Sequence, residues 1–509
     1  MKFERIVVFG DFHGDLDTML ASLADKGLIR YGSHELDGII EQIKASLNAA
    51  YSPSLEAMVK PQARQVRVIF LGDFLDRYDK GYHIIQFLEK IRWKKFGIDP
   101  IFLWGNHDLF NFHFFINPYE MADIYQGCGH SKNSIISYIN GMGLDKSLNS
   151  FKALHGEEIF KRQEQFYETG TLEYQETCYT LQYKYQCDLS PLVKYCHLAD
   201  DSYMAYYNKI MTEFGLDLDK GLEERGANWS VDLSYYLFNL LGKMTKGQRN
   251  WWDISHYDEV RENCYSRHLS DFNLFTNEAS EILPVDWRVI SLVWRHHYGH
   301  FFRRLKLLHN EGTTLFVHGG ISPLAMLDPL VFGNIYDPRK GTFKQVRSKY
   351  NNELSLDKLI NRDNRLIAQL VENALNDYSF RKFSGVEVVD QMGYCRGVAD
   401  GFPIFGGPIW SDFEYIQKNV KEHKKLLLLY KAFKEATGIE RIICGHTPFD
   451  IRDKPHFRFV KNRELQAIGL EYLCIDNSCS RGYRKKPILN GIDINQAGQI
   501  LEPGDVFSH

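Results

Sequence analysis

The chain has 509 residues, and its 61 Lys and Arg against 65 Asp and Glu leave a formal net charge of −4. With 44% hydrophobic and 25% charged residues, the composition is that of a globular protein with a large core, which excludes a mostly disordered chain. The near-neutral charge also argues against nucleic-acid binding through bulk charge. No run approaches the ~18 apolar residues of a membrane span. The nine cysteines form no CxxC pair, so we expect reduced thiols and a cytoplasmic protein.

Short apolar runs that end at a small or polar cluster predict buried strands. In chain order they are Ile6–Phe9, Val66–Leu71, Pro100–Trp104, Thr314–Val317, Arg441–Cys444 and Tyr472–Ile475. Between some of them, apolar residues recur at helical spacing, over 16–23, 84–91 and 415–436. This alternation of strands and helices predicts an α/β core.

Two long interruptions divide this pattern. The range 111–311 has few strand signals, many helical ones (Ser234–Met244 is an example) and abundant Tyr and Trp, and the range 321–405 carries the helical pattern Leu354–Leu375. We therefore expect a discontinuous core, 1–110 plus 312–509, with a helical insert over 111–311 and a smaller insertion over 321–405. The larger insert leaves and rejoins the chain beside the predicted site, so we expect a lid or an arm that docks a partner protein. The alternative is that its aromatic residues pack only its own core.

Polar residues follow five of the predicted strands directly. The fragments are Gly10-Asp11-Phe12-His13-Gly14, Gly72-Asp73-Phe74-Leu75-Asp76-Arg77, Gly105-Asn106-His107-Asp108, His318-Gly319-Gly320 and Gly445-His446. Loops at the carboxyl ends of sheet strands face one crevice, so these residues can converge although they lie far apart in the chain. Any one fragment alone would be an ordinary turn or cap. Five of them in succession predict a site.

The residues of these fragments suit a pair of divalent metals. They offer imidazole, carboxylate and amide groups without thiolate, a set that fits Mn, Fe or Zn. Two neighbouring cations need an anion between them, and Asp73 is the natural bridge. We place Asp11 and His13 on one metal, and the remaining ligands, Asn106, His318 and His446, on the other. Such a pair activates a water and clamps both oxygens of a phosphoryl displacement.

The fragments GDFHG, GDFLDR, GNHD, HGG and GH, in this order, resemble the calcineurin-like metallophosphoesterases. The resemblance implies a β-sandwich flanked by helices, here with a large helical insertion. Within this family, Asp76-Arg77 after Gly72-Asp73 resembles the motif of the phosphoprotein phosphatase branch. That branch includes the bacterial diadenosine tetraphosphatases. Ile409-Trp410-Ser411-Asp412 and Cys474-Ile475-Asp476-Asn477-Ser478 resemble later segments of that branch and of its bacterial members. The match covers roughly 1–110, 312–323 and 403–483, less than half of the chain.

The resemblance also implies roles for the residues around the metals. The six proposed ligands match the ligands of the family. His107 matches the general acid that protonates the leaving oxygen, and Asp76 matches the carboxylate that orients this imidazole. Arg77 matches a clamp on two phosphoryl oxygens, and Asn106 would also touch the phosphate. The alternative for Arg77 is a salt bridge to Asp76 or Asp79.

Two departures from the pattern concern phosphate binding. The branch usually reads Asp-Arg-Gly, whereas Arg77 is followed by Tyr78. The branch also carries a second phosphate-binding Arg between the Trp-Ser-Asp segment and the last His. Between Asp412 and His446 the only Arg of this chain is Arg441, which opens a strand. Arg295, in Trp294-Arg295-His296-His297, is the candidate replacement from the insert, and its alternative is an ordinary helix face.

We therefore expect a metal-dependent phosphomonoesterase that uses a hydroxide activated by two metals, with Mn²⁺ the expected ion and Fe or Zn the alternatives. The expected substrate is a phosphorylated protein, at phosphotyrosine or at phosphoserine and phosphothreonine. A Cys-based phosphatase is excluded because no Cys is followed six positions later by Arg. The alternatives are a dinucleoside polyphosphate hydrolase and a catalytically dead protein that binds partners through the insert.

The core with a long helical arm is also similar to the WipA/WipB type of phosphatase that intracellular bacterial pathogens inject into host cells. The start of the chain, MKFERIVVFGD, has too short an apolar run for a signal peptide. Such an effector would therefore leave the bacterial cytoplasm without a cleaved signal peptide. We expect no nucleic-acid partner and no segment that spans a membrane.

Overall fold

The structure is a computed structural model, and it describes part of the chain. The described residues are 3–116, 144–156, 287–322, 325–326, 336–337, 342–343, 355–376, 407–411, 413–422, 424–448, 459–476, 480, 489–495 and 498–501. The predicted helix Ser234–Met244, the motif residues Asp412, Asn477 and Ser478, and most of the ranges 111–311 and 321–405 lie outside them.

Two five-stranded sheets form the centre of the described structure. The first has the order β12 (Ile500–Leu501), β11 (Ile492–Asn495), β1 (Arg5–Phe9), β2 (Val66–Phe70) and β3 (Ile98–Phe102). The second has the order β4 (Leu308–Glu311), β5 (Thr314–Val317), β8 (Arg441–Cys444), β10 (Glu471–Cys474) and β9 (Val460–Lys461). Strands β1, β2 and β3 are parallel, as are β5, β8 and β10, and the outer strands pair antiparallel. A separate hairpin pairs β6 (Tyr336–Asp337) with β7 (Thr342–Phe343).

The sheets pack face to face because alternate residues of each strand point to opposite sides. In β1, Ile6 and Val8 face the other sheet, whereas Val7 and Phe9 face the covering helices. The core between the sheets consists of Phe3, Ile6, Val8, Ile69, Leu71, Ile101, Leu103, Phe316, Ile443, Leu473, Ile475, Ile492 and Ile494. The fold is thus a mixed α/β sandwich, as the sequence predicted.

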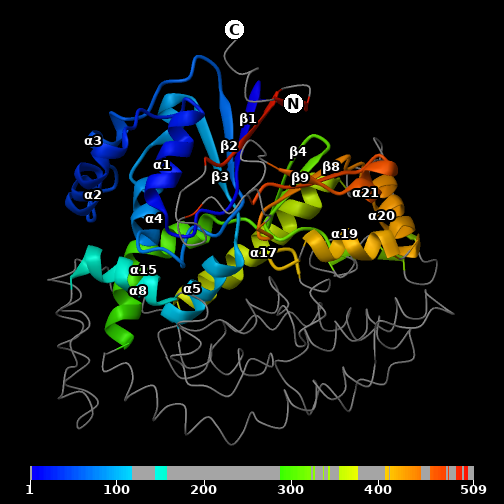
Figure 1. Cartoon of the computed structure of the whole chain (residues 1–509). Coiled ribbons are helices and arrows are strands. Elements are labelled where there is room, and N and C mark those ends of the chain that lie inside the picture. The colour runs from blue at the N-terminus through cyan, green and yellow to red at the C-terminus, as the bar shows by residue number, and fades with distance from the viewer. Residues whose placement is uncertain are drawn as a thin grey trace, which may run out of the picture.

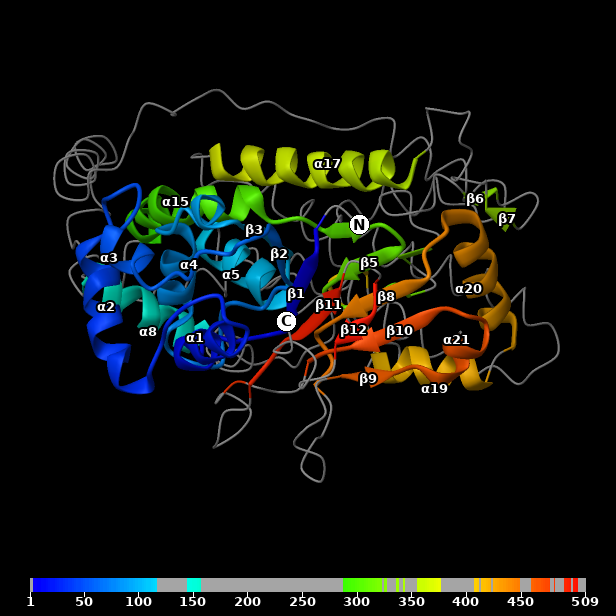
Figure 2. The same ribbon diagram turned by 90° about the horizontal axis from the view of Figure 1, so that it is seen from above.

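Helices cover the outer faces of both sheets (Figure 1). Beside the first sheet lie α1 (Leu16–Asp25), α2 (Leu36–Ala45), α3 (Pro53–Glu56), α4 (Gly81–Glu89), α5 (Asn106–Ile116), α8 (Leu144–His155), α15 (Trp287–Arg304) and the short 3₁₀ turns η1 (Ser33–Glu35) and η2 (Trp93–Phe96). Beside the second lie α19 (Phe413–Glu422), α20 (Lys424–Thr437) and α21 (Arg463–Ala467). The long helix α17 (Leu356–Asn376) runs across both halves of the molecule (Figure 2) and packs on α15 and β4.

The predicted strands are confirmed within one or two residues at their ends, and three details differ from the expectation. The predicted helix over 415–436 is two helices, α19 and α20. The fragment Asn106-His107-Asp108 is the first turn of α5 rather than a loop. Helices α8 and α15, which lie within the expected insert of 111–311, pack into the main core through residues such as Phe151 and Trp294. Among the described helices, none is long and apolar enough to cross a membrane.

Candidate metal and phosphoryl-transfer site

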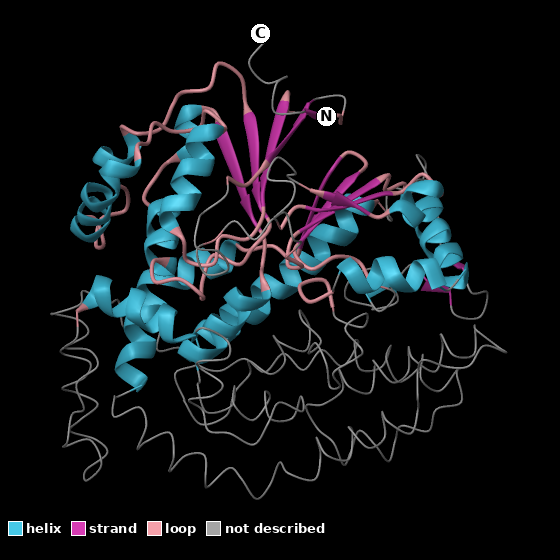
Figure 3. Ribbon diagram, in the orientation of Figure 1, coloured by secondary structure: helices cyan, strands magenta, loops and turns pink. Residues whose placement is uncertain are grey.

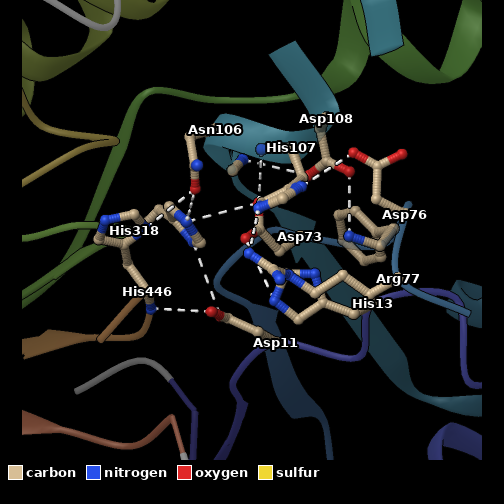
Figure 4. Close-up of polar contacts among 12 residues, drawn as sticks. Asp11, His13, Asp73, Asp76, Arg77, Asn106, His107, Asp108, His318 and His446 are labelled. Atoms are coloured by element: carbon tan, nitrogen blue, oxygen red, sulfur yellow. Dashed lines mark hydrogen bonds and ion pairs between the residues drawn. The ribbon is translucent and has the colours of Figure 1, made fainter. Parts of the chain in front are cut away.

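The predicted site residues lie at the carboxyl ends of the parallel strands of both sheets, where the connecting loops gather (Figure 3). Asp11 and His13 follow β1, Asp73 follows β2, and Asn106 and His107 follow β3. His318 and His446 follow β5 and β8 of the other sheet. The close-up in Figure 4 shows these side chains pointing toward one another, and all of them are buried.

Asp73 belongs to two groups of side chains with the spacing of metal ligands. One contains His13, Asp73 and His107, the other Asp73, His318 and His446, and the ligand atoms within each lie within 4.8 Å of one another. His13 Nε2 is 3.5 Å from Asp73 Oδ2, whereas His318 Nε2 is 3.5 Å from Asp73 Oδ1. The carboxylate thus offers one oxygen to each side, which is what a bridging ligand requires.

Asn106, His318 and His446 make a compact set on one side of Asp73. His318 Nε2 lies 3.0 Å and His446 Nδ1 lies 2.9 Å from Asn106 Oδ1. His318 Nδ1 lies 2.9 Å from the Leu71 carbonyl, which can only accept, so Nδ1 carries a proton. In the tautomer without a proton on Nε2, the Nε2 lone pair faces the lone pairs of Asn106 and Asp73. Electron-pair donors aimed at one another repel unless a cation lies among them, so these residues fit a divalent metal.

Asp11 joins the two halves of the site from the end of β1. Its Oδ2 accepts the backbone N–H of His446 at 2.8 Å, and its Oδ1 lies 3.7 Å from His318 Nδ1. Burial, followed by the Asp476 and Asp73 carboxylates, raises the pKa of Asp11 well above its usual value. Burial would also raise the pKa of Asp73, but the imidazoles around it lower that pKa well below its usual value. A cation beside both carboxylates would offset this repulsion.

Burial lowers the pKa of His13 well below its usual value, although Asp73 acts in the opposite direction. The His13 ring is therefore neutral near pH 7, the form in which imidazole binds a metal. Its ring meets that of His107 edge to face, with centroids 4.8 Å apart.

His107 forms a buried pair with Asp76 next to the proposed ligands. Its Nδ1 donates to Asp76 Oδ2 at 2.8 Å, and its backbone N–H donates to Asp73 Oδ1 at 2.9 Å. Arg77 Nη2 lies 3.2 Å from His107 Nε2. Because guanidinium cannot accept a hydrogen bond, Nε2 is the acceptor in this contact. His107 Nε2, the nitrogen expected to act as the general acid, and the Arg77 guanidinium therefore lie side by side.

The backbone of the site is strained at several positions. Among the described non-glycine residues, positive φ angles occur at His13 (44°), Asp73 (51°), Asp76 (68°), Arg77 (54°) and His446 (65°). Each lies in a loop after a strand of the site. Such conformations cost on the order of 1–3 kcal/mol each and persist where the surrounding structure enforces them. Their concentration here is typical of a functional site.

Two glycines allow the strand ends to approach these carboxylates. A Cβ on Gly105 would collide with the backbone and side chain of Asp73, and one on Gly445 would collide with the Asp11 carboxylate. Asp108 also contributes, since its carboxylate accepts from the backbone N–H groups of Phe74 at 2.9 Å and Gly105 at 3.1 Å. It fixes the loop after β2 against the start of α5.

The two arginines considered for a second phosphate contact are engaged elsewhere. Arg295 Nη1 donates to the carbonyls of Ala374 and Leu375 at 3.0 and 2.6 Å, so its charge caps the C-terminal end of α17. This matches the alternative interpretation, a helix residue in a structural role. Arg441 lies at the start of β8, the end opposite His446, where it pairs with Glu471.

Sequence reasoning missed two residues that contact Asp76. Asn111, on α5, and Ser147, on α8, both donate to its Oδ1. Asn111 stands one helical turn after His107, a signal that becomes visible only once α5 is known to be a helix. Ser147 has no local signal, because it stands alone on a helix 71 positions after Asp76.

The fold and the geometry thus bring together a buried site whose side chains could hold metal ions. Residues 4–190 match the family model described as calcineurin-like phosphoesterase. This part of the chain, somewhat over a third of its length, is therefore similar to a family of hydrolases that act on phosphoesters.

Among solved structures, the chain is similar to a cold-active protein-tyrosine phosphatase of the psychrophile Shewanella sp., with 11% identity and a TM-score of 0.37 over 98% of this chain and 77% of that chain. A point mutant of a cold-active protein tyrosine phosphatase matches with 11% identity and a TM-score of 0.35, covering 98% of this chain and 80% of that one. Likeness at this level carries no argument about the substrate. Among curated proteins, none matches the chain.

Proposed function

We propose that this protein is a metal-dependent protein phosphatase of the phosphoprotein phosphatase type, which hydrolyses phosphotyrosine or phosphoserine and phosphothreonine monoesters. The observation that carries the proposal is the shared carboxylate of Asp73, with His13 on one side, His318 and His446 on the other, and the His107–Asp76 pair adjoining both. The sequence motif and the contact between Arg77 and His107 support the assignment of the branch.

In this proposal, Asp11, His13 and Asp73 hold one divalent cation, and Asp73, Asn106, His318 and His446 hold the second, with Mn²⁺ the expected metal. When bound, such a pair supplies a water-derived nucleophile at neutral pH and offsets the charge of the phosphoryl oxygens. Arg77 then binds and orients the phosphoryl group through its planar fork. A phosphoryl oxygen at this position would replace the present contact between Arg77 and His107.

To act as the general acid, His107 must carry a proton on Nε2, which it can do once Arg77 has turned from Nε2 to the phosphoryl group; it then gives this proton to the leaving oxygen. Its Nδ1 is held by Asp76, so its Nε2 is the nitrogen directed toward the substrate side, beside Arg77. General-acid catalysis of this kind contributes about 10²- to 10⁴-fold to a rate, and its benefit is greatest for a poor leaving group. A serine, threonine or tyrosine side chain is such a leaving group.

The test offers purified protein with added Mn²⁺ a phosphotyrosine peptide, a phosphothreonine peptide and diadenosine tetraphosphate, with Asp73→Asn as the control. We expect the peptides to be preferred and the Asp73→Asn variant to lose both metal and turnover. Preference for the dinucleotide would replace the protein-phosphatase proposal with a dinucleoside polyphosphate hydrolase. Turnover of none of the three would favour a protein that acts by binding. Elemental analysis of the protein as purified, before Mn²⁺ is added, identifies the metal.

A further inference from the structure

We propose that Ser147 and Asn111 are positioning residues for His107, and that they act through the carboxylate of Asp76. The inference rests on the proposed function, because it concerns the proton that His107 delivers to the leaving oxygen. Neither residue touches the proposed metal ligands in a described hydrogen bond. In the described hydrogen bonds, Ser147 reaches His107 through Asp76, whereas Asn111 bonds both Asp76 and the His107 carbonyl.

The Asp76 carboxylate is buried and divides its two oxygens between different partners. Oδ2 accepts from His107 Nδ1 at 2.8 Å, whereas Oδ1 accepts from Asn111 Nδ2 at 2.6 Å and from Ser147 Oγ at 2.7 Å. The Ser147 hydroxyl also accepts the backbone N–H of Asp76 at 3.2 Å. Ser147 therefore bonds both the backbone and the side chain of a residue whose φ is +68°.

Ser147 belongs to α8, and a second serine of this helix contacts the segment that follows Asp76. One helical turn later, Ser150 Oγ accepts the Tyr82 N–H at 3.0 Å, near the start of α4. The N-cap residue of α4, Lys80, makes no side-chain capping bond of its own, so Ser150 supplies the cap from another helix. These two serines fix α8 against the segment that runs from Asp76 to Tyr82.

Asn111 connects the same carboxylate to α15. Besides Asp76, its Nδ2 donates to the His107 carbonyl at 2.9 Å, and its Oδ1 lies 3.5 Å from the Tyr82 hydroxyl. That hydroxyl accepts from Trp294 Nε1 on α15 at 2.7 Å. The helices on either side of residues 157–286, α8 and α15, thus both reach Asp76 through hydrogen bonds. Residues 157–286 of the expected insert therefore follow and precede two helices that support the general acid.

The physical role of these bonds is to prevent rotation of the carboxylate. If Ser147 or Asn111 loses its donor, Oδ1 stays buried with one bond fewer, and the carboxylate gains by turning toward another donor. Rotation draws Oδ2 away from His107 Nδ1 and loosens the imidazole. Partners of this kind commonly change activity by about tenfold or more without touching the substrate. The loss should fall on proton delivery alone.

The test compares Ser147→Ala with Ser150→Ala, a matched control on the same helix that also removes a buried hydroxyl with a backbone partner. Each variant is assayed with Mn²⁺ on phenyl phosphate, which needs a proton on its leaving oxygen, and on p-nitrophenyl phosphate, which does not. For Ser147→Ala and Asn111→Leu we expect kcat to fall about tenfold on phenyl phosphate and less than about threefold on p-nitrophenyl phosphate. Ser147→Thr, which keeps the hydroxyl, should restore the ratio of the two rates. Equal losses on both substrates, or the same change of ratio in Ser150→Ala, would overturn the inference.

Crystal structures of the metal-free variants give a readout that does not depend on turnover. In Ser147→Ala combined with Asn111→Leu, the Asp76 carboxylate should rotate and the distance from His107 Nδ1 to Asp76 Oδ2 should lengthen, while Ser150→Ala keeps the wild-type pair. An unchanged pair in the double variant would refute the positioning role. If wild-type protein turns over no phosphomonoester, the proposed function fails, and these structures still decide whether Ser147 and Asn111 hold Asp76.

Discussion

Acidification should destabilise the helix that carries the site, because a buried imidazole lies within it. His113 is on α5, the helix that also supplies Asn106, His107 and Asn111, and burial lowers its pKa from 6.5 to about 3. Between these values the unfolded chain binds a proton at His113 and the folded chain does not. The folded state therefore has its full stability above the unfolded pKa and loses it as the pH falls toward the folded one.

The magnitude follows from the same two values. Near pH 5, protonation of an unfolded imidazole whose pKa is 6.5 stabilises the unfolded state by about 2 kcal/mol relative to neutral pH. His113→Phe keeps a ring in the core and removes this proton. The destabilisation of wild-type protein between pH 7.5 and pH 5 should thus exceed that of the variant by about 2 kcal/mol.

Urea unfolding followed by tryptophan fluorescence at the two pH values measures the difference. The matched control is the same substitution at an exposed histidine, His34→Phe. The reasoning is refuted if His113→Phe and wild-type protein lose the same free energy of unfolding between the two pH values.

Three further substitutions test the roles assigned to glycine and arginine positions. Gly445→Ala should displace Asp11 and lower both metal content and turnover by about a hundredfold, measured by elemental analysis and p-nitrophenyl phosphate hydrolysis, because its Cβ would collide with the carboxylate. Gly38→Ala, with open space around its Cβ inside α2, should instead raise the free energy of unfolding by about 1 kcal/mol and spare activity; a loss of metal would contradict this. Arg295→Met should lower that free energy by about 2–3 kcal/mol as α17 loses its cap, with KM unchanged; a raised KM would instead make it a phosphate contact.

The strands and the ligands they carry were predictable from the sequence because both depend on local pattern. A run such as Arg441–Cys444 is apolar, short and ended by glycine, and His446 follows it directly. Since parallel strands of one sheet bring their carboxyl ends to one edge, the convergence of Asp11 and Asp73 followed from the predicted strands. His446 joins them from the second sheet, so its place beside them depends on how the two sheets pack. Their spacing and their bridging geometry needed the coordinates.

Helix α5 was missed because its burial removes the signal that identifies helices. Every residue from Asn106 to Ile116 is buried, so apolar and polar faces do not alternate at a period of 3.6. The antiparallel edge of the first sheet was equally hidden, because β11 pairs with β1 although Ile492 and Val8 are far apart in the chain. Long-range pairing of this kind leaves no local pattern.

The loop that holds the general acid shows why the supporting residues escaped sequence reasoning. Asp76 and Arg77 both have positive φ, which costs on the order of 1–3 kcal/mol each. Hydrogen bonds from Asn111 on α5 and Ser147 on α8 to Asp76 offset part of this cost. Neither donor belongs to the motif fragments that follow the strands. The sheets bring the proposed ligands and His107 together, whereas the orientation of the Asp76 carboxylate that holds His107 depends on helix contacts that form only in the folded chain. A variant of Ser147 should therefore separate metal binding, which it spares, from protonation of the leaving group, which it impairs.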